Sequence, residues 1–182
     1  RPITTGNNKY SNPTWSNDGK KFLFKNRIDK RTELYLYELE KRSLQMLTSV
    51  RTDISNIRWS NDDKRIIFLS LVEEKQKKLI KLPEKPNGAK WNNPPIEITD
   101  LEFRSDGEGY LKSGNKQVFL ITADGGPSIK ISNFEGKIYS CEWFSKKELI
   151  ISANFKKNID FKPRDSDIHI YNLNSKTLKK LT

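Results

Sequence analysis

The sequence predicts an all-β fold built from β-propeller repeats, with about four four-stranded blades in 182 residues. Two markers that recur together carry this prediction. The first is an aromatic residue before a tight polar turn, at spacings of 44, 44 and 40 residues: Trp15, Trp59, Phe103 and Trp143. The second is an aliphatic residue followed by a hydroxyl residue, 11 residues before an aromatic marker, ending at Thr4, Thr48 and Ser132. A fixed period of about 40–45 residues is typical of propeller blades.

The first repeat shows what one blade contains. A strand leads to Trp15 and into the turn 16–19, where Asp18 can accept backbone N–H groups and Gly19 can adopt a positive φ. Apolar and aromatic residues predict further strands in 20–24, 33–39 and 43–48. Four strands joined by hairpins form one propeller blade, which we place at 12–48. A wide side chain at a fixed position suits a wedge between blades, so we expect the four aromatic markers to be structural.

The same template divides the rest of the chain. We expect a closing strand of a preceding blade at 1–5, and three further blades at 54–95, 96–132 and 137–182. The expected third strands of the four blades are 34–37, 79–82, 118–121 and 168–171. The Pro-, Gly- and Asn-rich run 83–95 replaces a regular closing strand in the second blade. A long insertion at 153–167 separates the second and third strands of the last blade.

The composition limits the classes of partner. The net charge is +11 and the sequence pI about 9.6, which raises the question of a polyanionic partner. The lysines and arginines are spread over nearly every predicted turn, however, and no nucleic-acid-binding motif is present. No apolar run approaches the ~18 residues of a transmembrane helix. We therefore expect neither a nucleic acid nor a membrane as partner, and interpret the basic residues as a solubilising surface.

The residues needed for catalysis are not found together. Nucleophilic hydrolysis requires a Ser or Cys with a His base, but the only histidine is His169, on one face of a predicted strand, and no G-x-S-x-G motif occurs. The single cysteine, Cys141, excludes an internal disulfide and is interpreted as a buried strand residue. The polar turns lack the ligand pattern of a calcium loop, and there is no phosphate-binding glycine loop. We expect no catalytic residue, no metal site and no cofactor, and hence no enzyme activity in this segment.

The repeat resembles a known type of propeller. Its residues are Pro13-x-Trp15-Ser16-x-Asp18-Gly19-Lys20-Lys21-x-x-Phe24, then Glu33-Leu34-Tyr35, then Leu47-Thr48. They are similar to the repeat of TolB-like proteins and of the N-terminal propeller of prolyl oligopeptidase family serine peptidases. The segment 96–132 looks like the mid-propeller region of acylaminoacyl-peptidase-like members of that family. The positions that carry this second resemblance are Arg104, Asp106, Gly107, Gly109, Tyr110, Asp124, Gly125 and Gly126.

This resemblance implies a function for the parent protein. Family propellers have seven or eight blades, precede a C-terminal α/β-hydrolase domain, and cap its active site so that only short peptides or small acylated substrates enter. About four blades and a start at Arg1 then suggest an excised stretch of a larger propeller. The expected partners are the hydrolase domain, a peptide substrate, and a second copy bound through open blade faces. The alternative is a TolB-like protein-interaction propeller without peptidase activity.

Overall fold

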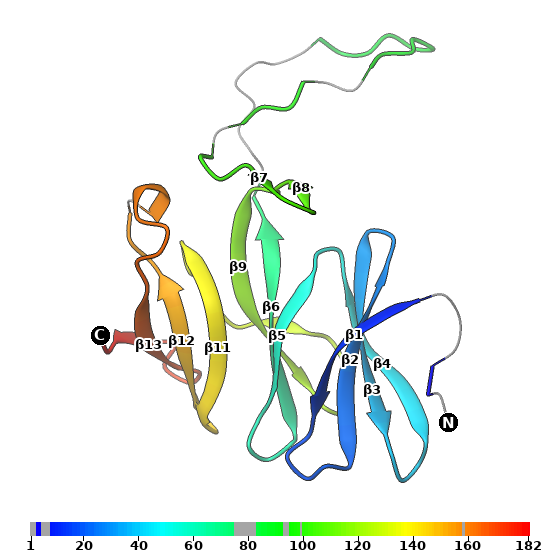
Figure 1. The fold of residues 1–182 in the computed structure, drawn as a ribbon, viewed down its shortest axis with the longest axis vertical. Helices are drawn as coiled ribbons and strands as arrows, with labels where there is room; N and C mark the ends of the chain where they lie inside the picture. Colours follow the sequence, from blue (N-terminus) through cyan, green and yellow to red (C-terminus); the bar gives the residue numbers. More distant parts are fainter. Residues whose placement is uncertain (1–2, 5–7, 75–82, 93–94, 99, 158) are drawn as a thin grey trace. The chain divides into compact units, whose positions relative to one another are not determined.

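The computed structural model describes residues 3–4, 8–74, 83–92, 95–98, 100–157 and 159–182. The chain divides into two compact units, one made of residues 1–72 and 115–182 and the other of residues 73–114. The described elements are all strands apart from one 3₁₀ turn, Ile159–Phe161, and form four antiparallel sheets, three of four strands and one of two (Figure 1). None of the described residues belongs to a helix that could cross a membrane. The all-β propeller class is confirmed.

The first sheet forms where the first repeat predicts a blade. Its strands, in the order β1-β2-β3-β4, are Lys9–Trp15, Lys21–Ile28, Arg31–Glu38 and Ser43–Val50. Alternation along β3 turns Leu34 and Leu36 into the core, while Tyr35 and Tyr37 lie on the opposite face of the sheet. The sequence predicts a closing strand at residues 1–5, but residues 3 and 4 lie outside any strand. Residues 1, 2 and 5 lie outside the described part of the chain.

The second sheet differs from the prediction. Its strands, in the order β10-β9-β6-β5, are Ile129–Lys130, Gly114–Thr122, Arg65–Glu73 and Ile54–Trp59. The residues expected to form two blades, 54–95 and 96–132, therefore supply a single four-stranded sheet. The strand expected at 118–121 lies in β9, which is the third strand of this sheet when the strands are counted from β5. The third strand expected at 79–82 lies outside the described residues.

The smaller unit, residues 73–114, explains why the period predicted two blades where the structure has one sheet. Residues 73–114 number 114 − 73 + 1 = 42, close to one repeat, so Phe103 falls near the position of a marker by length alone. Without them, the distance from Trp59 to Trp143 shortens from 84 to 42 residues, which is one repeat. In this unit the described strands are only β7, Arg104–Ser105, and β8, Gly109–Tyr110, too short to form a blade.

The third sheet follows the last predicted blade, 137–182, closely. Its strands, in the order β11-β12-β13-β14, are Lys137–Ser145, Glu148–Asn154, Asp167–Asn172 and Leu178–Lys180. The third strand expected at 168–171 is the centre of β13. The predicted insertion lies between β12 and β13 and contains the single 3₁₀ turn (Figure 1).

The core of the larger unit lies between its sheets. Strand β6 is buried on both faces, and this explains the unbroken apolar run in its sequence. Ile66 and Phe68 pack with the first sheet in one cluster, whereas Ile67 and Leu69 pack with the third sheet in another. The second sheet is therefore the middle layer, as expected for consecutive blades.

Candidate functional site: the turns that join the sheets

The tight turns that follow β1 and β5 are stabilised by hydrogen bonds within each turn. In the first repeat, the Ser16 hydroxyl donates to Asp18 Oδ1 at 2.6 Å and accepts the N–H of Lys21 at 3.0 Å. In the second repeat, Ser60 donates to Asp62 at 2.7 Å and accepts the N–H of Arg65 at 3.0 Å. Each hydroxyl thus closes a turn. The carboxylate bonded to each hydroxyl is the turn's own Asp, and the only histidine, His169, lies on β13.

The same bonds shift the acidity of the two turn carboxyls. The hydrogen bond from Ser16, followed by that from the Lys20 N–H, holds the pKa of Asp18 below its usual value. The hydrogen bond from Ser60 lowers the pKa of Asp62, against a smaller opposing effect of burial. Both carboxyls are therefore ionised at neutral pH and accept hydrogen bonds within their turns.

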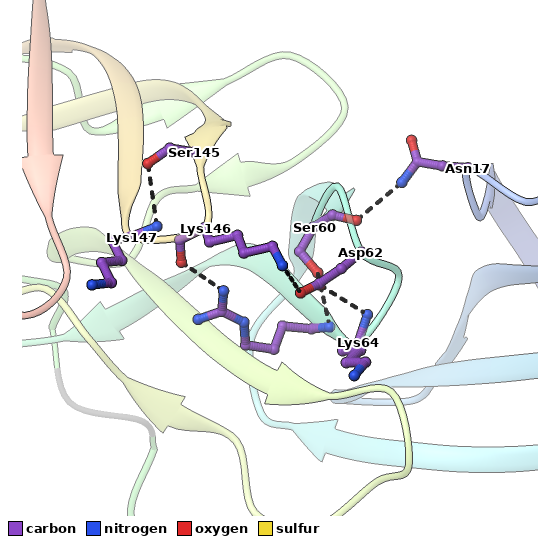
Figure 2. A network of polar contacts seen from close by, with 8 residues as sticks. Asn17, Ser60, Asp62, Lys64, Ser145, Lys146 and Lys147 are labelled. Carbon is purple, nitrogen blue, oxygen red and sulfur yellow. Dashed lines mark hydrogen bonds and ion pairs between the residues drawn. The ribbon is translucent and has the colours of Figure 1, made fainter.

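The turns also bind one another across the sheets. Asp63 accepts three hydrogen bonds from the preceding turn: from the backbone N–H and side-chain amide of Asn17 at 2.8 and 2.7 Å, and from the N–H of Asp18 at 3.0 Å. The Asn17 amide also donates to the Ser60 carbonyl at 3.0 Å (Figure 2). The first two turns therefore form one hydrogen-bonded unit.

A second set of contacts continues the network to the third sheet. Lys146 lies 3.9 Å from Asp62, and its carbonyl accepts a hydrogen bond from Arg65 at 2.6 Å. The Arg65 guanidinium also lies over the ring of Trp143, 4.7 Å from its centroid, in cation–π geometry. Three turns far apart in the sequence thus come together at one end of the sheets (Figure 2).

The four aromatic markers differ in burial and in whether they contact a neighbouring sheet. Trp59 is 7% exposed and donates from Nε1 to the Thr14 carbonyl of the first sheet at 3.1 Å, so it is the predicted wedge. Trp143 packs against the second core cluster. Trp15, by contrast, is 56% exposed and lies on Phe22, with ring centroids 5.1 Å apart. Phe103 is 42% exposed and stacks on Tyr110 within the smaller unit. For Trp15 and Phe103 the described residues place no second sheet against the ring.

The sequence analysis missed an Asn position shared by the first two repeats, which in the second repeat joins two sheets. Asn12 and Asn56 each stand three residues before a tryptophan, with positive φ values of 56° and 50°, at bulges in β1 and β5. The Asn56 side-chain oxygen accepts the backbone N–H of Cys141 in the third sheet. An Asn at the same offset in two repeats was the available signal, because Asn tolerates the left-handed region and can bond a neighbouring backbone.

The smaller unit contains the hairpin singled out by the peptidase resemblance. Arg104 and Ser105 pair with Tyr110 and Gly109, and Gly107 and Gly109 have positive φ values of 80° and 78°. A pocket of about 250 Å³ opens beside it. Apolar and acidic residues dominate its lining: Glu73, Glu74, Ile96, Glu97, Ile98, Asp100, Phe103, Tyr110 and Leu111, with Lys112 and Ser113.

The remaining positions of that resemblance lie in the larger unit. Asp124, Gly125 and Gly126 form the turn between β9 and β10, where the Thr122 hydroxyl donates to the Gly125 carbonyl at 2.5 Å. The Asp124 carbonyl accepts a hydrogen bond from Gln45 of the first sheet at 3.1 Å. A side chain at Gly125 would meet the Gln45 amide, so the glycine permits this close approach.

The side chains of His169 and Cys141, two residue types that often act in catalysis, are both buried. His169 is buried on β13, with its ring centroid 5.0 Å from that of Phe155. Cys141 is buried in the second core cluster, and burial raises the pKa of its thiol to about 12. Within the described residues, no group of three or more His, Cys, Asp or Glu side chains is placed to hold a metal ion.

Comparisons with known proteins agree with this architecture. No protein-family model and no curated protein matches the sequence, but solved structures match the fold. An acylaminoacyl peptidase in complex with Z-Gly-Gly-Phe-chloromethyl ketone has a TM-score of 0.69 at 19% identity, over 95% of this chain and 25% of that chain. TolB from Acinetobacter baumannii has a TM-score of 0.60 at 15% identity, over 99% of this chain and 34% of that chain.

The chain has a β-propeller fold. Pyrococcus horikoshii acylaminoacyl peptidase supports the same conclusion, with a TM-score of 0.68 at 19% identity over 95% of this chain and 25% of its own. The chain spans about a quarter to a third of the length of these three propeller-containing proteins. The solved structures with a similar fold include both classes of protein that the repeat resembles, the peptidases and TolB.

Proposed function

We propose that this chain is a non-catalytic propeller segment of a serine peptidase, which caps the active site of a C-terminal α/β-hydrolase domain. It would limit access to short peptides or acylated amino acids. The observation that carries the proposal is the likeness to acylaminoacyl peptidases over 95% of the chain, with a TM-score of 0.69 against 0.60 for TolB.

The insertion 73–114 supports this proposal further. A blade needs only four strands and short turns, so a hairpin with a pocket is additional to the fold. The pocket combines aromatic and aliphatic side chains such as Phe103, Tyr110 and Ile98 with carboxylates such as Asp100. Such a lining suits contacts with a peptide, which presents both apolar side chains and N–H donors.

The gene downstream of the Thr182 codon provides the first test. We expect further propeller repeats, then a hydrolase domain with a G-x-S-x-G serine and a late histidine. The full-length product should cleave a short acylated peptide more efficiently, in kcat/KM, than a long peptide with the same cleavage site. Equal kcat/KM values for both lengths would contradict gating while leaving the peptidase assignment intact.

A TolB-like interaction propeller is the second candidate, favoured by the match to TolB over 99% of this chain. It predicts a gene without a hydrolase domain and a product without peptidase activity. Pull-down of a defined protein partner by the purified product would then replace the kinetic assay.

Self-association of the chain is proposed through the outer face of the first sheet. This face carries Trp15, Phe22 and Tyr37 in one row and Leu44 and Met46 on β4, with Trp15, Leu44 and Met46 exposed. A second copy could bury these side chains, as the second sheet buries the other face of the same strands. Light scattering should show a mass that rises with concentration, and a constant monomer mass would overturn the proposal.

A further inference from the structure

Hydrogen bonds and an ion pair hold described residues on both arms of the insertion between β12 and β13. Asn154, fully buried at the end of β12, donates to the Lys162 carbonyl at 2.9 Å and accepts the N–H of Lys156 at 3.1 Å. Lys156 also forms an ion pair with Asp165 across the loop. The Tyr139 hydroxyl of β11 donates to the Pro163 carbonyl at 2.7 Å. These contacts tie both arms of the loop to the third sheet.

The most exposed apolar side chain of this loop is Phe161. It ends the 3₁₀ turn, which buries none of its residues, and is 82% exposed, the highest value among the large exposed hydrophobic residues of the described chain. A single exposed aliphatic residue is common on protein surfaces. Phe161 is an aromatic ring whose loop is hydrogen-bonded on both sides, at Lys156 and at Lys162, so less backbone conformational entropy is lost when the loop packs against a partner.

The charged side chains of this loop are mainly basic. Lys157, Lys162 and Arg164 are exposed and make no ion pair with another described residue. Asp165 is neutralised by its pair with Lys156, which leaves Asp160 as the other acidic residue of the loop. The loop that carries Phe161 therefore has a net positive charge and is complementary to an acidic partner.

We propose that the described residues of this loop, 155–157 and 159–166, bind an acidic protein segment, with Phe161 packed against apolar side chains of that segment and the three basic residues facing its carboxylates. This interaction is independent of the proposed gating function.

Other anionic partners fit this surface less well. A membrane-bound element presents a face of several apolar residues, whereas Phe161 is the one large hydrophobic side chain exposed among the described residues of the loop. Single-stranded nucleic acid stacks on several aromatic rings along a basic groove. Here the described part of the loop has one exposed ring, Phe161, while Phe155 of the same loop packs against Phe134 and His169. One fixed aromatic residue with a basic rim is typical of a protein-binding hot spot.

A peptide selection tests the proposal. A displayed library of short random peptides is selected on the chain and counter-selected on Phe161→Ala, and the best peptide is synthesised. We expect Asp and Glu to be enriched around apolar residues. Binding should weaken about tenfold in Phe161→Ala, as for a hot-spot residue, and in the charge variant K157Q/K162Q/R164Q.

The matched control is Phe144→Ala, an exposed aromatic residue toward the opposite end of β11, which should change binding less than about twofold. Because Phe161 buries nothing in the chain, its variant should keep the wild-type Tm. The proposal is overturned if no acidic peptide is enriched, or if Phe161→Ala binds the peptide as tightly as the wild type. It is also overturned if phosphatidylserine vesicles or oligo(dT) bind through Phe161 and the peptide does not.

Discussion

The hydrogen bonds to Asp63 should contribute measurably to the stability of the sheet stack. Asp63→Ala removes all three bonds that its carboxylate accepts from Asn17 and Asp18 of the preceding turn. It leaves the turn's own Ser60–Asp62 hydrogen bond in place. The perturbation is therefore directed at the contact between two sheets.

The size of the effect follows from the kind of bond. Hydrogen bonds to a charged group contribute about 1.5–3 kcal/mol in general, and the backbone groups here are exposed, so water can replace part of each bond. We expect a loss of about 2 kcal/mol in the free energy of unfolding for the three together. At about 2–4 °C per kcal/mol for a domain of this size, the Tm should fall by about 4–8 °C.

Asp29→Ala provides the matched control. Asp29 has a φ of 50°, close to the 53° of Asp63, so both substitutions place an alanine in the left-handed region and share that strain. Asp29 lies in the exposed turn between β2 and β3. Urea unfolding followed by tryptophan fluorescence should show Asp63→Ala about 2 kcal/mol less stable than Asp29→Ala. A difference below about 0.5 kcal/mol would refute the reasoning, because the bonds would then be replaced by water without loss.

Three further predictions concern the wedge, the turns and the thiol. In the same urea assay, Trp59→Phe should lower the free energy of unfolding by about 1 kcal/mol, because the hydrogen bond to the Thr14 carbonyl is lost. Trp59→Ala should lower it by about 3–5 kcal/mol, because the ring no longer fills the space between the sheets. Equal losses for the two variants would contradict the role of Trp59 as a wedge. Because the pKa values of Asp18 and Asp62 are lowered from 3.8, the unfolded state binds more protons. Their stabilisation should be present above about pH 4 and lost as the pH falls through the folded-state values, and D18N/D62N should flatten this acid limb of a Tm–pH curve. Cys141, with its thiol pKa raised to about 12, should react with Ellman's reagent at pH 8 only at the rate of unfolding, and reaction at the rate of a free thiol would contradict its burial.

The local part of the fold was accessible from the sequence. Alternation and turn chemistry predicted the strands of the first and last sheets, including the interruption at 153–167, because these signals depend on neighbouring residues alone. The Ser-x-Asp turns were recognised as turns for the same reason. Their bonds to one another were not, since Asp63 and Asn17 are 46 residues apart and nothing within either turn indicates the contact.

The sequence by itself determined that this chain alternates strands and tight turns with a period of about one propeller blade. Only the tertiary structure decided which strands share a sheet. Strand β9 lies beside β6 across an insertion of one repeat length, and the two-sided burial of β6 shows why this arrangement is stable. It also decided that Trp59 is buried and Trp15 exposed. The two tryptophans occupy the same position in their repeats, and burial depends on whether another sheet packs against that position.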